Sequence, residues 1–123
     1  MGKKVLIVED EAIAALSLKE LLEFWRYETC EPAASGEEAI GKAHSEQPDI
    51  ILMDIKLRGE MDGLRAARQI ISRRRVPIII MSGYSKDELL KIPGFECVDA
   101  FINKPMDLDD LKKALESAAT AKS

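Results

Sequence analysis

The chain has 123 residues and a formal net charge of −4, with 46% hydrophobic and 33% charged residues, which is the composition of one globular domain. This acidic balance argues against nucleic acid as a direct partner, because phosphate binding requires a basic face. No apolar stretch approaches the roughly 20 residues that span a bilayer, and the first apolar segment is too short for a signal peptide. We therefore expect a cytoplasmic protein without membrane contact.

The first three predicted elements are a strand, a helix and a second strand. Residues 3–10 form a short apolar run rich in β-branched residues, which predicts a strand. Residues 12–26 have an apolar stripe at helical spacing, made of Ala14, Leu18, Leu21, Leu22 and Trp25. Residues 28–34 predict a weak strand, and its polar character and Pro32 place it at the edge of a sheet.

The middle of the chain predicts a capped helix followed by a buried strand. Ser35 and Glu38 have the spacing of a capping box, which opens a helix that runs to about Glu46. The next strand, over 48–54, contains four consecutive apolar residues and then ends in Asp54. A carboxylate at the end of such an apolar strand needs a reason to be there.

The same alternation continues in the second half. Asp62 is expected to cap a helix with an apolar face of Leu64, Ala67 and Ile71, and the basic run over 72–76 fits the C-terminus of that helix. Residues 76–82 predict another buried strand.

The last predicted elements are a short helix, a strand and a final helix. Ser85 and Glu88 form a second capping box, whose short helix stops before Pro93. Residues 97–103 predict the last strand, and the final helix presents an apolar face of Leu108, Leu111, Leu115 and Ala118.

Five strands and five helices therefore alternate, and three strands are continuous apolar runs. Strands buried on both faces have this pattern, so we predict an α/β fold, doubly wound, with a parallel sheet between helix layers. Residues 1–123 are expected to form one domain. Cys30 and Cys97 would lie at opposite edges of this sheet and remain reduced thiols.

Polar side chains gather at the carboxyl ends of the predicted strands, where open parallel sheets bind ligands. Glu9 and Asp10 follow the first strand, Asp54 ends the third, Ser82 ends the fourth and Lys104 follows the fifth. Two carboxylates about 4 Å apart repel by about 4 kcal/mol at an effective dielectric constant of 20. A hard divalent cation such as Mg²⁺ would relieve this repulsion.

This set of groups also fits phosphoryl transfer. A metal and a lysine neutralise charge on the transferring oxygens, and one carboxylate accepts the phosphoryl group. Asp54 is the candidate acceptor, because it alone ends a central strand without an acidic neighbour.

The chain resembles the receiver domain of two-component response regulators through five strings in order and spacing: "LIVEDE", "PDIILMDI", "MDG", "PIIIMSG" and "FINKP". The resemblance covers the whole chain and implies a flavodoxin-like fold with strand order 2-1-3-4-5. It also implies that Asp54 accepts a phosphoryl group from the phosphohistidine of a histidine kinase. Such a domain is a signalling switch that catalyses only its own phosphorylation and dephosphorylation.

The resemblance assigns roles to individual residues. Asp10, Asp54 and the backbone carbonyl of Lys56 would ligate Mg²⁺, and Glu9 would contribute through water. Ser82 would hydrogen-bond the phosphoryl group, and Lys104 would pair with one of its oxygens.

Further implied features concern the switch and the partners. Phe101 matches the aromatic switch residue of the family, and the bond between Lys104 and Pro105 is expected to be cis. Tyr84 lies at a variable position on the rim of the site, and Arg58 stands where most receivers have proline. The partners implied are a sensor histidine kinase or phosphotransfer protein and a downstream protein that binds the face of the fourth helix, fifth strand and fifth helix. No output domain is expected within the chain.

Three other functions share part of this pattern. A phosphatase of the haloacid-dehalogenase type also combines Asp with Mg²⁺, but it has a second Asp where this chain has Lys56. A flavin-binding module would require a Gly/Ser/Thr-rich loop after the first strand, where this chain has "EDEA". A degenerate receiver that serves only as a docking scaffold is at odds with the intact set Asp10, Asp54, Ser82 and Lys104.

Overall fold

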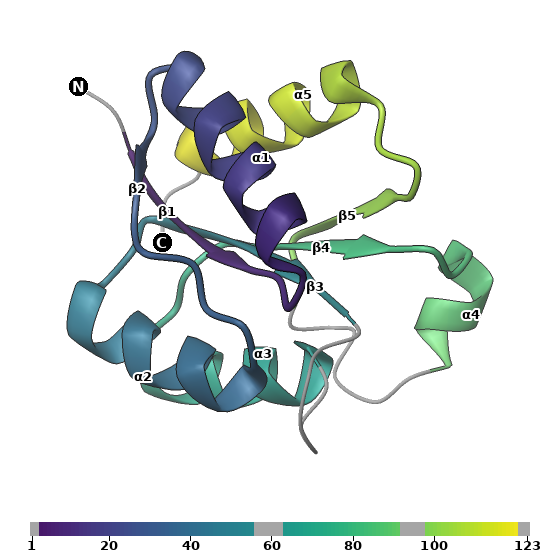
Figure 1. Cartoon of the computed structure of the whole chain (residues 1–123). Helices are drawn as coiled ribbons and strands as arrows, with labels where there is room; N and C mark the ends of the chain where they lie inside the picture. The colour runs from purple at the N-terminus through teal and green to yellow at the C-terminus, as the bar shows by residue number, and fades with distance from the viewer. Residues whose placement is uncertain (1–2, 56–62, 92–97, 121–123) are drawn as a thin grey trace.

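The sheet has five parallel strands in the order β2-β1-β3-β4-β5 within the residues that the computed structural model describes, which are 3–55, 63–91 and 98–120 (Figure 1). The strands are β1 (Lys4–Val8), β2 (Glu28–Thr29), β3 (Ile50–Asp54), β4 (Ile78–Ser82) and β5 (Ala100–Asn103). The predicted α/β fold and its strand order 2-1-3-4-5 are confirmed.

Helices cover both faces of the sheet (Figure 1). They are α1 (Ala12–Phe24), α2 (Gly36–Glu46), α3 (Gly63–Arg73), α4 (Lys86–Leu90) and α5 (Leu108–Thr120). α1 and α5 pack on one face, and α2 and α3 pack on the other, as the two apolar clusters of the core show. Among the described helices, none combines the length and the apolar character that crossing a membrane requires.

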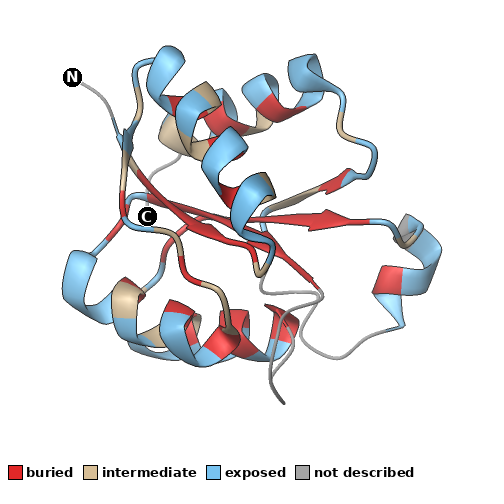
Figure 2. Cartoon of the chain, viewed as in Figure 1, coloured by how far each residue is buried: buried red, intermediate tan, exposed pale blue. Residues whose placement is uncertain are grey.

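The core follows from the alternation of side chains along the central strands. Every residue of β3 and β4 is buried (Figure 2). In β3, Ile50 and Leu52 point to the α1–α5 layer, whereas Ile51 and Met53 point to the α2–α3 layer. Because a strand presents successive side chains to opposite faces, a continuous apolar run fills both layers at once.

The edge strand is shorter than the sequence predicts. The predicted strand over 28–34 contributes only Glu28 and Thr29 to β2, and Ala33 then forms an isolated parallel bridge with Val8. Pro32 has no N–H to donate, so the ladder is interrupted before the chain returns to β1 at Ala33.

The two predicted capping boxes differ. At α4 the box is complete, since Ser85 Oγ accepts from the Glu88 N–H at 3.2 Å and Glu88 accepts from the Ser85 N–H at 2.9 Å. At α2, Ser35 Oγ accepts from the Glu38 N–H, but the Glu38 carboxylate accepts from Ala34, one residue before the cap. The box predicted for α2 is therefore only half formed, and the predicted shortness of α4 is confirmed within the described residues.

Helices α1 and α5 also meet through an aromatic side chain. Trp25, at the C-terminal end of α1, is half-buried against the apolar cluster of this layer. The ammonium group of Lys112 in α5 lies 6.0 Å from the centre of the indole ring, at the limit of a cation–π contact.

Several predictions fall on residues outside the described part of the chain, namely the helix cap at Asp62, the helix stop at Pro93 and the positions of Cys97, Lys56 and Arg58. Cys30 is a buried free thiol. The bond between Lys104 and Pro105 is cis, as predicted.

Candidate functional site

The candidate site is an acidic cluster at the carboxyl ends of β1 and β3. These strands are neighbours in the sheet, with Val8 paired to Met53, so the residues that follow Val8 meet the end of β3. Carboxylate oxygens of Glu9, Asp10 and Asp54 all lie within 4.8 Å of one another. The convergence expected from the sequence is therefore present in the structure.

Glu9 is the most buried member of this cluster. Its residue is 4% exposed, and Asp54 is 6% exposed, whereas Asp10 is half-buried. Burial is the main reason why the pKa of Glu9 is raised to about 7. The charge of Asp54 and a hydrogen bond with Asp10 raise this pKa further, while the Glu11 N–H, 3.2 Å from Glu9 Oε2, and the charge of Lys104 lower it.

Lys104 brings a positive charge into the cluster from β5. Its Nζ lies 2.6 Å from Asp54 Oδ2 and 3.8 Å from Glu9 Oε1. Burial lowers the pKa of the Lys104 ammonium, but the hydrogen bond to Asp54 and the charges of Asp54, Glu9 and Glu11 outweigh burial, so the pKa is raised. Lys104 therefore stays charged at neutral pH and offsets part of the negative charge of the carboxylates.

Ser82 and Tyr84 lie at the end of β4, between β3 and β5. Ser82 is fully buried, and its Oγ accepts a hydrogen bond from the Tyr84 N–H at 2.9 Å. The Tyr84 carbonyl accepts in turn from Asn103 Nδ2 at 2.7 Å, which ties this turn to β5. Tyr84, but not Ser82, lines the open hollow above the cluster.

This hollow has a volume of about 500 Å³ and is lined by Asp10, Glu11, Asp54, Ile55, Gly83, Tyr84 and Lys104. Glu11 occupies the N-cap position of α1, but its side chain makes no capping hydrogen bond. Glu11 lines the hollow, and its negative charge acts on Lys104 there.

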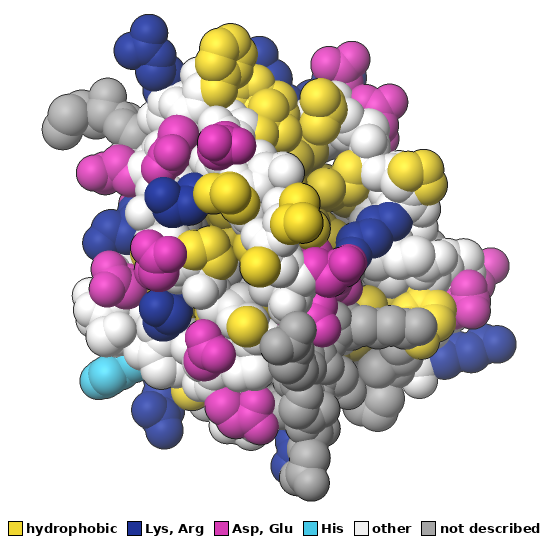
Figure 3. Space-filling model, viewed as in Figure 1, with side chains coloured by type: hydrophobic (Ala, Val, Ile, Leu, Met, Phe, Trp, Pro, Cys, Tyr) yellow, Lys and Arg dark blue, Asp and Glu magenta, His cyan; other side chains and the backbone are white. Residues whose placement is uncertain are grey.

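A second hollow adjoins the cluster on the side of α1. It has a volume of about 600 Å³, and its lining includes Glu9, Asp10, Ile13 and Leu16. Ile13 is 83% exposed and Leu16 is 55% exposed, and Figure 3 shows hydrophobic side chains gathered on this face of the molecule. Apolar surface therefore lies next to the carboxylates.

Phe101 is placed on β5, opposite Ile80 of β4. Its side chain is half-buried and packs against the cluster of the α2–α3 layer. It is thus separated from the acidic cluster by the end of β4. Lys56 and Arg58 lie outside the described residues.

The sequence interpretation missed Gly63 as a residue of the site. The Gly63 N–H donates to the Ile55 carbonyl at 2.9 Å, at the start of α3. A Cβ atom on Gly63 would lie 2.6 Å from the Asp54 carbonyl oxygen and 3.0 Å from Ile55 Cα. The absence of a side chain here lets α3 approach the backbone that carries Asp54. The "MDG" string contains this signal, but on the sequence alone only Asp62 within it has a predicted structural role, as a helix cap.

The family model of the response regulator receiver domain matches residues 5–116. The chain therefore belongs to the receiver domain family. Members of this family are signalling modules that are generally phosphorylated on an aspartate.

Individual relatives and structures agree with this assignment. The transcriptional regulatory protein PdtaR of Mycobacterium tuberculosis is 35% identical over 118 residues, which are 96% of this chain and 57% of that protein. The sporulation initiation phosphotransferase F of Bacillus subtilis is 28% identical and is covered over 98% of its length by the whole of this chain. The crystal structure of a putative response regulator from Chloroflexus aurantiacus has a TM-score of 0.83 and 28% identity, covering 98% of this chain and all of that one.

Proposed function

We propose that residues 1–123 form a cytoplasmic phosphorylation switch in which Asp54 accepts a phosphoryl group from the phosphohistidine of a histidine kinase or phosphotransfer protein, with the help of Mg²⁺. The observation that carries the proposal is the position of Lys104 Nζ, 2.6 Å from Asp54 Oδ2 and 3.8 Å from Glu9 Oε1, beside a cluster of three carboxylates. A buried acceptor with a lysine and further acids beside it is the arrangement that phosphoryl transfer to a carboxylate requires.

The residues present fit a hard divalent cation. Three carboxylates meet, and the single charge of Lys104 leaves a negative excess. Asp10 and Asp54 would hold Mg²⁺ together with the backbone carbonyl of Lys56, and Glu9 would act through water. When bound, the cation neutralises charge on the transferring oxygens.

The proposed step forms one bond and breaks one. A carboxylate oxygen of Asp54 attacks phosphorus, and the new O–P bond replaces the N–P bond of the phosphohistidine. The leaving imidazole nitrogen keeps the electron pair of that bond and takes up a proton from solvent. Lys104 then pairs with an oxygen of the phosphoryl group, and the Ser82 hydroxyl donates to another. Attack of water on phosphorus later releases phosphate and restores the Asp54 carboxylate.

A protein donor is supported by the surface around the acceptor. The exposed Ile13 and Leu16 lie beside the carboxylates and offer apolar area that a partner can bury. The donor therefore has a place to dock while its phosphohistidine reaches Asp54.

The response to phosphorylation is proposed to pass from Ser82 to Phe101. Tyr84 and Arg58 would form the rim that controls access of water to the phosphoryl group. A downstream protein would bind the face formed by α4, β5 and α5, without direct contact to nucleic acid or membrane.

The test is the intact mass of the protein after incubation with acetyl phosphate and Mg²⁺. Wild type and the matched control Asp87→Asn, an exposed aspartate of α4, should gain one phosphoryl group. Asp54→Asn should gain none while keeping its circular dichroism spectrum, and Lys104→Met should be labelled far more slowly. Normal labelling of Asp54→Asn would refute the assignment. Steady turnover of a phosphomonoester would instead favour a phosphatase.

A further inference from the structure

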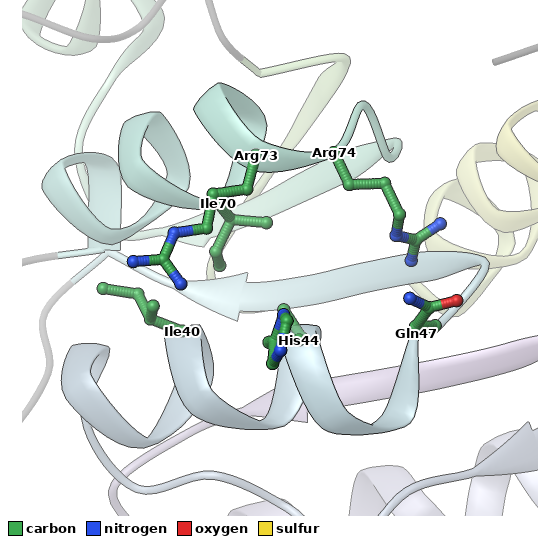
Figure 4. Close-up of a pocket in the computed structure, with 7 residues that line it drawn as sticks. Ile40, His44, Gln47, Ile70, Arg73 and Arg74 are labelled. Atoms are coloured by element: carbon green, nitrogen blue, oxygen red, sulfur yellow. The ribbon is translucent and has the colours of Figure 1, made fainter.

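A cavity of about 290 Å³ lies between α2 and α3 (Figure 4). Its lining residues are Ile40, Ala43, His44, Gln47, Ile70, Arg73 and Arg74. Gln47 leads into the start of β3, whereas Asp54 ends that strand. The cavity is therefore separate from the acidic cluster, by about the length of a five-residue strand.

The cavity lining combines basic and apolar side chains. Figure 4 shows the guanidinium group of Arg73 on the side of Ile40, whereas that of Arg74 lies at the opposite end of the cavity, on the side of Gln47. His44 lies between Ile40 and Gln47 on α2. None of the seven lining residues is acidic, although the chain as a whole has 22 acidic residues. Ile70 is 4% exposed and forms a fixed apolar surface beneath the cations.

The two arginines are not used in the same way. Arg74 donates a hydrogen bond to the Pro48 carbonyl, which holds its side chain in the wall of the cavity. The salt bridges of the described residues involve Lys4, Lys19 and Lys104, and none of them involves Arg73. Arg73 and His44 each lie in the last turn of a helix, where a positively charged side chain interacts favourably with the helix dipole. That position accounts for the residue types at the two helix ends but does not require an apolar cavity between them.

Gln47 has a backbone conformation that is unusual for its residue type. It ends α2 in the left-handed conformation, with φ 47° and ψ 60°, where glycine is the usual residue. The chain has a long amide side chain at this position, and that side chain lines the cavity.

We propose that this cavity binds a small organic anion with an apolar body. Arg73 and His44 hold the anionic head, the body rests on Ile40 and Ile70, and Gln47 lines the opposite end of the cavity. The cavity volume of about 290 Å³ fits such a ligand. An apolar cavity of about 150 Å³ already accepts benzene, so room remains for a phosphonate, phosphate or carboxylate head. Arginine suits this head, since its guanidinium pairs with planar and tetrahedral oxyanions through two N–H groups.

The probe for the test is phenylphosphonate, whose P–C bond prevents phosphoryl donation to Asp54. Its binding would be followed by amide chemical shifts of the isotope-labelled protein, without divalent cations, so that the acidic cluster repels the probe. We expect saturable binding, with the largest shifts at α2 and α3 and the same affinity for Asp54→Asn. Inorganic phosphate, which lacks the apolar body, should bind at least about tenfold more weakly.

Two substitutions in α3 separate a site from general attraction to positive charge. Arg73→Gln should weaken phenylphosphonate binding about tenfold or more. Arg68→Gln, which removes the same charge from an exposed position of α3 outside the cavity, should leave the affinity within about twofold. Equal weakening by both variants would overturn the proposal, as would an absence of saturation at about 10 mM probe.

Gln47→Gly adds a test in which folding and binding move in opposite directions. Glycine suits the left-handed conformation, so the midpoint of thermal unfolding should rise. The loss of the Gln47 side chain removes part of the cavity lining and should weaken phenylphosphonate binding severalfold. Unchanged binding in this more stable variant would remove Gln47 from the site and contradict the proposed mode of binding.

Discussion

Glu9 has a carboxyl group whose surroundings oppose its ionisation. The side chain is 3% exposed, and its pKa is raised to about 7, chiefly by burial. In the unfolded chain the group has its ordinary pKa of 4.5. Between these two values the metal-free folded protein binds a proton that the unfolded chain does not, so this group makes the stability fall as pH rises.

This difference predicts the pH dependence of unfolding. In urea with a chelator present, the contribution of Glu9 to the free energy of unfolding should fall by roughly 3 kcal/mol between about pH 4.5 and pH 7. It should change little above that range. Glu9→Gln should remove this component, because the amide does not titrate and its oxygen can still accept from the Glu11 N–H. Glu20→Gln, at an exposed position of α1, is the control and should retain the slope. An unchanged slope in Glu9→Gln would show that another group titrates.

Gly63 acts at the level of two elements, because it sets how closely α3 approaches the end of β3. A methyl group at this position would meet the Asp54 carbonyl oxygen at 2.6 Å, closer than carbon and oxygen can approach. Either the helix or the backbone of Asp54 would have to move. The same residue therefore affects both packing and the position of the carboxylate.

We predict that Gly63→Ala destabilises the protein by about 1–3 kcal/mol and slows phosphorylation by acetyl phosphate. The matched control is Gly41→Ala in α2, where a Cβ atom meets nothing within 4 Å. That control should stabilise the protein by about 0.5–1 kcal/mol, since alanine is the better helix former. Chemical denaturation measures both changes, and a neutral effect of Gly63→Ala would mean that α3 can shift without cost.

The elements also show what the sequence could predict. Period and length identified β3 and β4, because a strand buried on both faces must be continuously apolar. The predicted extent of β2 is too long, because the point at which an edge strand containing Pro32 leaves the ladder depends on its pairing with β1, which the sequence alone does not give. The half-formed cap of α2 has the same origin, because the choice of Glu38 between two adjacent N–H groups depends on the approach of the preceding chain.

For the whole molecule, parallel topology made the acidic cluster predictable. In a parallel sheet the carboxyl ends of β1, β3 and β5 must lie at the same end of the sheet. The strand order then brings Asp10, Asp54 and Lys104 close to one another. The packing role of Gly63 and the cavity between α2 and α3 could not be predicted. Both depend on distances between elements that are far apart in the sequence, and these distances are set only when the layers pack.

The repulsion within the cluster should make Mg²⁺ a stabilising ligand of the whole domain. On the proposed function, Mg²⁺ binds the folded chain and not the unfolded one, so saturating Mg²⁺ should raise the midpoint of thermal unfolding by roughly 5–10 °C. Sodium chloride at the same ionic strength is the control for screening. Asp10→Asn should lose most of the rise, and an equal rise with sodium chloride would argue against a specific cation site.

The contact between Trp25 and Lys112 gives the protein an internal optical reporter. Trp25 is the single tryptophan of the chain and ends α1, whereas the acidic cluster lies at the start of that helix, about 20 Å away along its axis. Its emission spectrum therefore samples the α1–α5 layer and not the carboxylates themselves. A change of fluorescence that accompanies loading of the acidic cluster would report movement relayed through the helix layer, and steady emission during the same titration would report an event confined to the end of the sheet.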